Sequence, residues 1–217
     1  MIRRVLLLGA VLGNMVPAAP AESSTSSGVV SVAPEISELG AGWGERNVIF
    51  AIDPLEQPAE FVNAHASQNP TNRASIVQLV RKSMSLNGSV GMTEIWYGHS
   101  GADLELIISR YPDQPSLDKH WKEFSTKFKP KAVAPKVGQA AGWLDIGAEA
   151  TGREFVFRQG LFSALVSCKV ALSEEPLMKL VKATAAKLTK ATDGAATRSQ
   201  PVGPDTNRTS AVAGSGR

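Results

Sequence analysis

A serine flanked by a histidine and a glycine follows an apolar run in the stretch Gly98-His99-Ser100-Gly101-Ala102. The nucleophile elbow of a hydrolase has the pattern Gly-x-Ser-x-Gly, with a strand before the serine and a helix after it. Here Ala102 replaces the last glycine, and the segment that follows alternates like a strand. Ser100 is therefore either the nucleophile of a small secreted serine hydrolase or the loop serine of a β-hairpin.

The histidine that a hydrolase needs favours the second interpretation. The only histidine after Ser100 is His120, which we expect on the polar side of a helix with the apolar residues Leu117, Trp121, Phe124 and Phe128. A hydrolase places its acid and histidine after several further strand and helix units, and this chain lacks the length for them. We therefore predict no catalytic residues, and we keep the hydrolase that uses Ser100 as the alternative.

The predicted turn is a candidate contact surface. Trp96, Tyr97, His99 and Asp103 lie in or beside it and could touch a ligand or partner. In the alternative interpretation, the two aromatic residues alternate between the core and the sheet surface, and His99 is merely solvated. The first interpretation predicts a binding site at one end of the sheet.

A second candidate surface is basic. Its lysines lie on the second predicted helix and in the loop after it, with few acidic residues to offset them, and the densest part is Lys122, Lys127, Lys129 and Lys131. Such a patch could meet an envelope protein or an anionic surface such as lipid headgroups or wall polymer. Alternatively, these lysines only keep a helix end and a loop soluble.

Metal ions and cofactors are not expected. The three histidines, His65, His99 and His120, lie in different contexts, with none of the short spacings that metal ligands share. The single cysteine, Cys168, alternates with Phe162, Ala164 and Val166 on one strand face. It is therefore predicted to be buried and inert, the alternative being a disulfide between two chains.

The charge distribution excludes a general polyanion binder. The formal net charge is +3, but residues 22–189 carry 17 basic and 18 acidic side chains, a net charge of −1. The excess positive charge lies near the two ends of the chain. A field that attracts nucleic acid is therefore not predicted.

The first 21 residues have the features of a secretory signal peptide. Arg3 and Arg4 precede an apolar run of 12 residues at 5–16, and Ala19 and Ala21 occupy the A-x-A positions before the expected cleavage. A membrane span needs about 20 residues, so no transmembrane segment is expected. The sequence predicts an exported protein, periplasmic or secreted, cleaved after Ala21.

The rest of the chain divides into three parts. Residues 22–34 and 190–217 are small, polar and free of aromatic side chains, so we predict a disordered or extended N-terminal segment over residues 22–38 and a disordered tail. Residues 39–189 are predicted to form one α+β domain. Hydrophobic periodicity predicts strands at 47–53, 92–97, 104–111 and 140–147, a hairpin turning at 158–160, and helices at 72–88, 116–128 and from 173, with a weaker helix at 58–65.

This order predicts an antiparallel sheet built from hairpins and packed by about three helices, which we expect on one face. Two consecutive units have the predicted order strand, strand, helix. They are either a duplicated ββα element or two units that share this order by chance. The chain resembles a loose class of exported bacterial α+β domains, which run from a Gly-Trp pair, here Gly42-Trp43, to a late hairpin, here Phe157-Arg158-Gln159-Gly160, and a closing helix. The resemblance implies the fold and carries over no functional residue. The sequence thus predicts a non-enzymatic binding or accessory module of the bacterial envelope.

Overall fold

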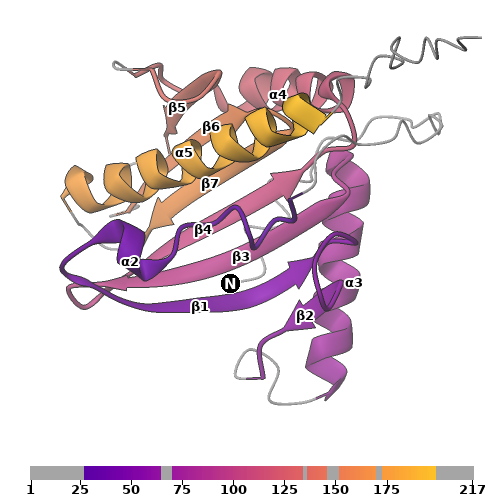
Figure 1. Cartoon of the computed structure of the whole chain (residues 1–217), viewed down its shortest axis with the longest axis horizontal. Coiled ribbons are helices and arrows are strands. Elements are labelled where there is room, and N and C mark those ends of the chain that lie inside the picture. Colours follow the sequence, from indigo (N-terminus) through magenta and orange to yellow (C-terminus); the bar gives the residue numbers. More distant parts are fainter. Residues whose placement is uncertain (1–26, 65–69, 134–135, 146–151, 170–172, 199–217) are drawn as a thin grey trace, which may run out of the picture.

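A computed structural model of the protein describes residues 27–64, 70–133, 136–145, 152–169 and 173–198 (Figure 1). The predicted signal peptide and His65 lie outside the described residues. The elements, in chain order, are α2 (Ile36–Leu39), β1 (Trp43–Ile52), β2 (Glu60–Val62), α3 (Pro70–Asn87), β3 (Gly91–His99), β4 (Ala102–Arg110), α4 (Gln114–Phe128), β5 (Ala140–Leu144), β6 (Arg153–Gln159), β7 (Phe162–Cys168) and α5 (Glu174–Arg198). No helix in these ranges is long and apolar enough to cross a membrane.

The strands form a single seven-stranded sheet in the order β2-β1-β3-β4-β7-β6-β5. Every neighbouring pair is antiparallel. The two predicted hairpins, β3–β4 and β6–β7, meet at the centre of the sheet, where β4 pairs with β7. The predicted α+β fold is therefore confirmed.

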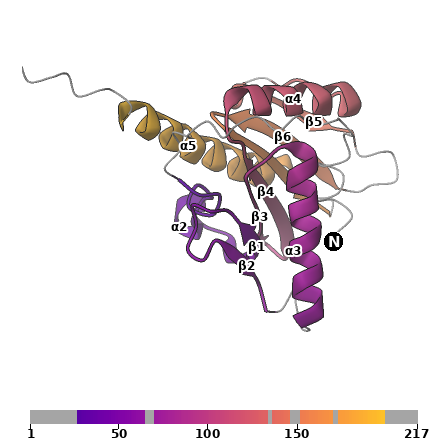
Figure 2. The same cartoon turned by 90° about the vertical axis from the view of Figure 1, so that its right-hand side faces the viewer.

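Helices cover both faces of the sheet, so the prediction that they share one face is wrong. Figure 2 shows α5 on one side and α3 and α4 on the other. The central strands explain this arrangement, because they carry apolar side chains on both faces of the sheet. Leu104 and Leu106 of β4 belong to the core under α5, whereas Ile107 belongs to the core under α3 and α4. The two ββα units repeat an element order, but their helices, α4 and α5, lie on opposite faces.

The helix α4 shows how one of these faces is built. Asp113 caps its start by accepting a hydrogen bond from Ser116 N at 2.7 Å, and the left-handed Lys129 ends it. Leu117, His120 and Phe124 are buried, so the prediction that His120 lies on the polar side is wrong. Their spacing of three and four residues places all three on one helix face. Burial lowers the pKa of His120 to about 4.

An N-terminal strap, residues 28–39, lies against the sheet on the same side as α5 (Figure 1). It adds Val29, Val32, Ala33 and Leu39 to the core, and each of these is at most 2% exposed. The described part of residues 22–38, for which a disordered or extended segment was predicted, is ordered and mostly without regular secondary structure. It packs onto the core of the domain.

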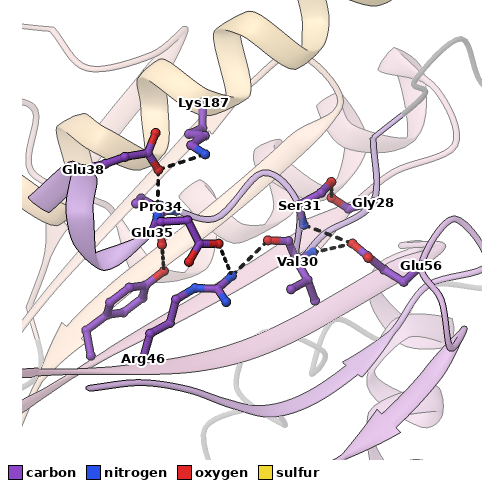
Figure 3. Close-up of polar contacts among 10 residues, drawn as sticks. Gly28, Val30, Ser31, Pro34, Glu35, Glu38, Arg46, Glu56 and Lys187 are labelled. Atoms are coloured by element: carbon purple, nitrogen blue, oxygen red, sulfur yellow. Dashed lines mark hydrogen bonds and ion pairs between the residues drawn. The ribbon is translucent and has the colours of Figure 1, made fainter. Parts of the chain in front are cut away.

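Side chains from distant elements hold the backbone of the strap (Figure 3). Glu56 Oε1 accepts hydrogen bonds from the backbone N–H groups of Val30 and Ser31 at 2.7 and 3.1 Å. Arg46 donates to the carbonyl of Val30 at 3.2 Å, and Lys187 forms an ion pair with Glu38 at 2.9 Å. These contacts replace the regular hydrogen bonding that the strap lacks over most of its length.

Two further boundaries differ from the predictions. The weak helix expected at 58–65 is instead the short edge strand β2, which pairs with β1. The helix α5 continues to Arg198, whereas the disordered tail was predicted from residue 190. The alanines at 191, 195 and 196 favour this continuation, because alanine has the highest helix propensity.

Candidate ligand site on the open half of the sheet

The β3–β4 turn does not have the geometry of a nucleophile elbow. Ser100 and Gly101 are the two turn residues, with φ of 50° and 78°, and positive φ at both positions is typical of a type I′ hairpin. Ser100 is exposed, and the strand β4 follows it directly. The predicted hairpin turn is confirmed, and the helix N-terminus that would help to form an oxyanion hole does not follow this serine.

Two of the predicted contact residues, Tyr97 and His99, lie on the face of the sheet that the N-terminal strap covers. Tyr97 is fully buried under the N-terminal strap, where its hydroxyl donates to Pro34 O at 2.7 Å. Burial raises the pKa of Tyr97 to about 12. The ring of His99 packs 4.9 Å from that of Trp43. Because side chains alternate along a strand, Trp96 faces the opposite way and does not share a site with Tyr97.

Trp96 belongs to a row of mainly polar side chains that crosses the sheet. The strand register places Trp96 opposite Glu105, Glu105 opposite Ser167, and Ser167 opposite Glu154. Directly opposed residues share a face, so this row runs over β3, β4, β7 and β6. In Figure 1, α3 and α4 both lie toward the right-hand end of the sheet, and the β3–β4 turn is at the left. Within the row, Glu105 and Ser167 are buried and Trp96 is partly exposed.

The row forms one wall of a recess with a volume of about 270 Å³. Inside it, Ser167 Oγ donates to Glu105 Oε2 at 2.9 Å, and Lys169 Nζ lies 5.4 Å from the centre of the Trp96 ring. The full lining is Trp96, Gly101, Ala102, Asp103, Glu105, Ser167 and Lys169. The structure therefore brings the predicted residues Trp96 and Asp103 together and adds three chemical groups to them: a carboxyl, a hydroxyl and an ammonium.

Glu94 supports the floor of this recess. It lies two residues before Trp96, is 3% exposed, and accepts a hydrogen bond from Trp96 Nε1 at 2.8 Å. Its carboxyl group also forms a hydrogen bond with that of Glu105. Burial, and then the charge of Glu105, raises the pKa of Glu94 to about 7. Glu94 therefore keeps its proton up to about neutral pH.

The apolar surroundings of Glu94 explain this burial. Its partner on β4 is Ile107, and its partner on β1 is Phe50. Both belong to the core that α3 and α4 cover. Glu94 thus lies at the boundary between that core and the polar row, where the hydrogen bond from Trp96 holds its carboxyl in place.

The other residues considered in the sequence analysis lie outside the lining of this recess. Among the described residues, no group of three or more His, Cys, Asp or Glu side chains could hold a metal ion. Cys168 is buried on the opposite face, as predicted. The lysines of the basic patch are exposed along α4 and the loop after it, where Lys131 pairs with Asp145 at 3.4 Å and Lys127 lies 5.2 Å from the Phe128 ring.

Sequence reasoning missed Glu94, Glu105, Ser167 and Lys169. A signal for the first two was present, because both glutamates occur inside strands whose other residues are mostly apolar. An acidic residue at such a position is costly unless it is paired or functional. Ser167 and Lys169 had no comparable signal, since they reach the recess only through the pairing of β7 with β4.

Comparisons with known proteins leave the recess to be interpreted from its own chemistry. No protein-family model matches the chain, and neither the characterised proteins nor the solved structures include a match.

Replacing Glu94 with glutamine is expected to stabilise the protein at high pH. The pKa of Glu94 is raised on folding, so the native state loses stability as the pH rises from about 4.5 through about 7. Glutamine cannot ionise and can still accept the hydrogen bond from Trp96. The gain in free energy of unfolding should be roughly 2–3 kcal/mol larger at pH 8 than at pH 4, as measured by urea unfolding.

The matched control for this substitution is Glu45→Gln, which removes a charge from an exposed position on β1. It should change the stability little at either pH, as surface substitutions usually do. An effect of Glu94→Gln that is the same at both pH values would show that Glu94 does not take up a proton on folding.

Proposed function

We propose that the protein is a binding module and that the recess around Trp96 is its ligand site. The supporting observation is the convergence of an aromatic ring, carboxyl groups, a hydroxyl and an ammonium on one open recess. Small-molecule sites typically combine apolar surface with a few directed polar groups in this way. The alternative, a serine hydrolase using Ser100, has no comparable support, because Ser100 is a turn residue outside the lining of the recess.

The buried carboxyl of Glu94 supports the same proposal. An ionisable group with a strongly raised pKa beside an open recess is a recognised mark of a functional site. Its burial lowers stability at neutral pH, and proteins tolerate such costs chiefly where function requires them. The basic patch is a weaker candidate, since its lysines are spread over an exposed helix side and a loop.

Nuclear magnetic resonance would test the site directly. We expect that ligands found in a screen of small polar solutes will shift the indole N–H signal of Trp96, identified by its loss in Trp96→Phe. Trp96→Ala should weaken binding at least about fivefold, because the loss of an aromatic contact at the site costs more than about 1 kcal/mol. The control Lys127→Gln/Lys129→Gln alters only the basic patch and should bind normally. Binding that is lost in this control and retained in Trp96→Ala would place the site on α4 instead.

We further propose that the protein is exported, with residues 1–21 removed. The support is the arrangement of Arg3 and Arg4, the apolar run and the alanines at 19 and 21. After expression in a bacterium, mass spectrometry of the exported protein should find Glu22 at the N-terminus, and replacing Ala19 and Ala21 with leucine should prevent cleavage. A protein that stays in the cytoplasm with Met1 or Ile2 at its N-terminus would contradict this proposal.

A further inference from the structure

We infer that the recess binds an organic cation, an ammonium group on a small molecule or a peptide, and that Lys169 competes with this ligand for the face of Trp96. The inference rests on the proposed function and adds the chemical class of the ligand. Three features of the site support it: the position of Lys169, the balance of charge around the recess, and the proton held by Glu94.

Lys169 shows that the indole face accepts a cation. Its Nζ lies 5.4 Å from the centre of the Trp96 ring, within the range of a cation–π interaction. Lys169 is exposed and directly follows the end of β7. An external ammonium group can therefore compete with Lys169 for the same ring face.

The charges around the recess favour a cation over an anion. Two carboxylates, Asp103 and Glu105, line it from β4, and Glu94 contributes a third carboxyl from β3. Glu154 of β6 lies beside Ser167 in the same row, and β1 contributes the uncharged Asn47 at this level. Lys169 supplies the only positive charge among these residues. The recess therefore stays negative, and a second cation is attracted to it.

The proton on Glu94 links cation binding to pH. Near neutral pH Glu94 still holds a proton, because burial and then the charge of Glu105 raise its pKa to about 7. A bound ammonium group stabilises the ionised form of Glu94, so binding releases that proton to the solvent. The affinity should therefore rise about tenfold between pH 6 and pH 8 and level off above that.

The probes for the test are n-butylammonium chloride, sodium butyrate and 1-butanol, which share a chain length and differ in charge. Each is titrated into the full exported chain while the indole N–H signal of Trp96 is followed. We expect n-butylammonium to bind more tightly than the other two, with the pH dependence given above. Equal or tighter binding of butyrate or butanol would overturn the inference and leave the proposed site in place.

Variants test the role of Lys169. Lys169→Gln removes the competing cation and should tighten n-butylammonium binding about two- to fivefold, the factor that corresponds to one exposed cation–π contact. If Lys169 instead contacted an anionic ligand, the same change would weaken binding. The control Lys179→Gln removes an exposed lysine from α5, on the opposite side of the sheet, and should leave the affinity unchanged.

A last variant separates the effect of the proton on Glu94 from the contact between the ligand and Trp96. Glu94→Gln keeps the hydrogen bond from Trp96 and leaves Glu105 without an ionisable partner. It should flatten the pH dependence between pH 6 and pH 8 while Trp96 still responds to n-butylammonium. An unchanged tenfold pH dependence in Glu94→Gln would contradict the proton release, and failure of n-butylammonium to shift the signal of Trp96 in any variant would overturn the inference as a whole.

Discussion

A chain that begins at Leu39 is expected to lose most of its stability. Such a chain keeps every strand of the sheet and lacks the strap residues Val29, Val32 and Ala33, which are at most 2% exposed. Burying a valine side chain contributes roughly 1.5–3 kcal/mol, so the two valines alone contribute about 3–6 kcal/mol. A single domain is stable by only about 5–15 kcal/mol. Urea unfolding followed by circular dichroism should therefore show a lower midpoint or no folded baseline.

The truncation also uncovers groups that the strap satisfies. The buried hydroxyl of Tyr97 loses its acceptor, Pro34 O, and the sheet residues Ile95 and Leu106 lose part of their cover. An uncovered apolar face of this kind binds hydrophobic dyes and promotes aggregation. We expect increased fluorescence of a dye such as anilinonaphthalene sulfonate in the truncated chain.

Milder variants guard against a truncation that does not fold at all. Val32→Ala should lower the free energy of unfolding by roughly 1–2 kcal/mol through the lost methyl groups and the cavity they leave. The control Ser37→Ala changes an exposed residue of the same segment and should have little effect. A chain that starts at Glu22 should be as stable as one that starts at Met1. Equal stability of the chains that begin at Glu22 and Leu39 would show that the strap contributes nothing.

The strap also shows which parts of the fold could be predicted from the sequence. The strands β3, β4 and β7 and the helices α4 and α5 were predicted because each carries its own apolar period over many residues. The strap has no such period, since its contacts are to side chains far away in the chain, such as Asp53, Glu56 and Tyr97. Local composition shows a few apolar residues among small and polar ones, and the acceptors that order the strap are brought to it by the tertiary fold.

The site could be predicted in part for a similar reason. Trp96 and Asp103 lie beside a turn that the sequence predicts, so both were candidates. The alternation that places Trp96 and Tyr97 on opposite faces of the sheet was only the alternative interpretation. Glu105 and Lys169 meet only because β4 pairs with β7, across more than fifty residues of chain. Packing on both faces of the sheet decides that the β3–β4 and β6–β7 hairpins pair side by side. No local sequence pattern encodes this pairing.

Replacing Arg110 with methionine is expected to lower the free energy of unfolding by about 3–5 kcal/mol. Arg110 donates to both carboxylate oxygens of Asp53, from Nε at 3.0 Å and from Nη2 at 2.6 Å. The two side chains are 2% and 0% exposed, so methionine leaves a buried carboxylate without its counter-ion. In the comparison pair, Arg81 Nη2 lies 2.9 Å from Glu60 Oε2, and the two side chains are 63% and 35% exposed. Arg81→Met should cost less than about 1 kcal/mol.

Asp53 also connects this ion pair to the strap, because its carboxylate accepts a hydrogen bond from Val29 N at 3.1 Å. An unpaired carboxylate at this position draws water toward the buried strap, so Arg110→Met should speed hydrogen exchange at the Val29 amide more than at the Leu117 amide of α4. The double variant Asp53→Asn/Arg110→Met should be less destabilised than the sum of the single variants, since no uncompensated charge remains. Additive losses, with exchange at Val29 unchanged, would mean that the ion pair and the strap stabilise the fold independently.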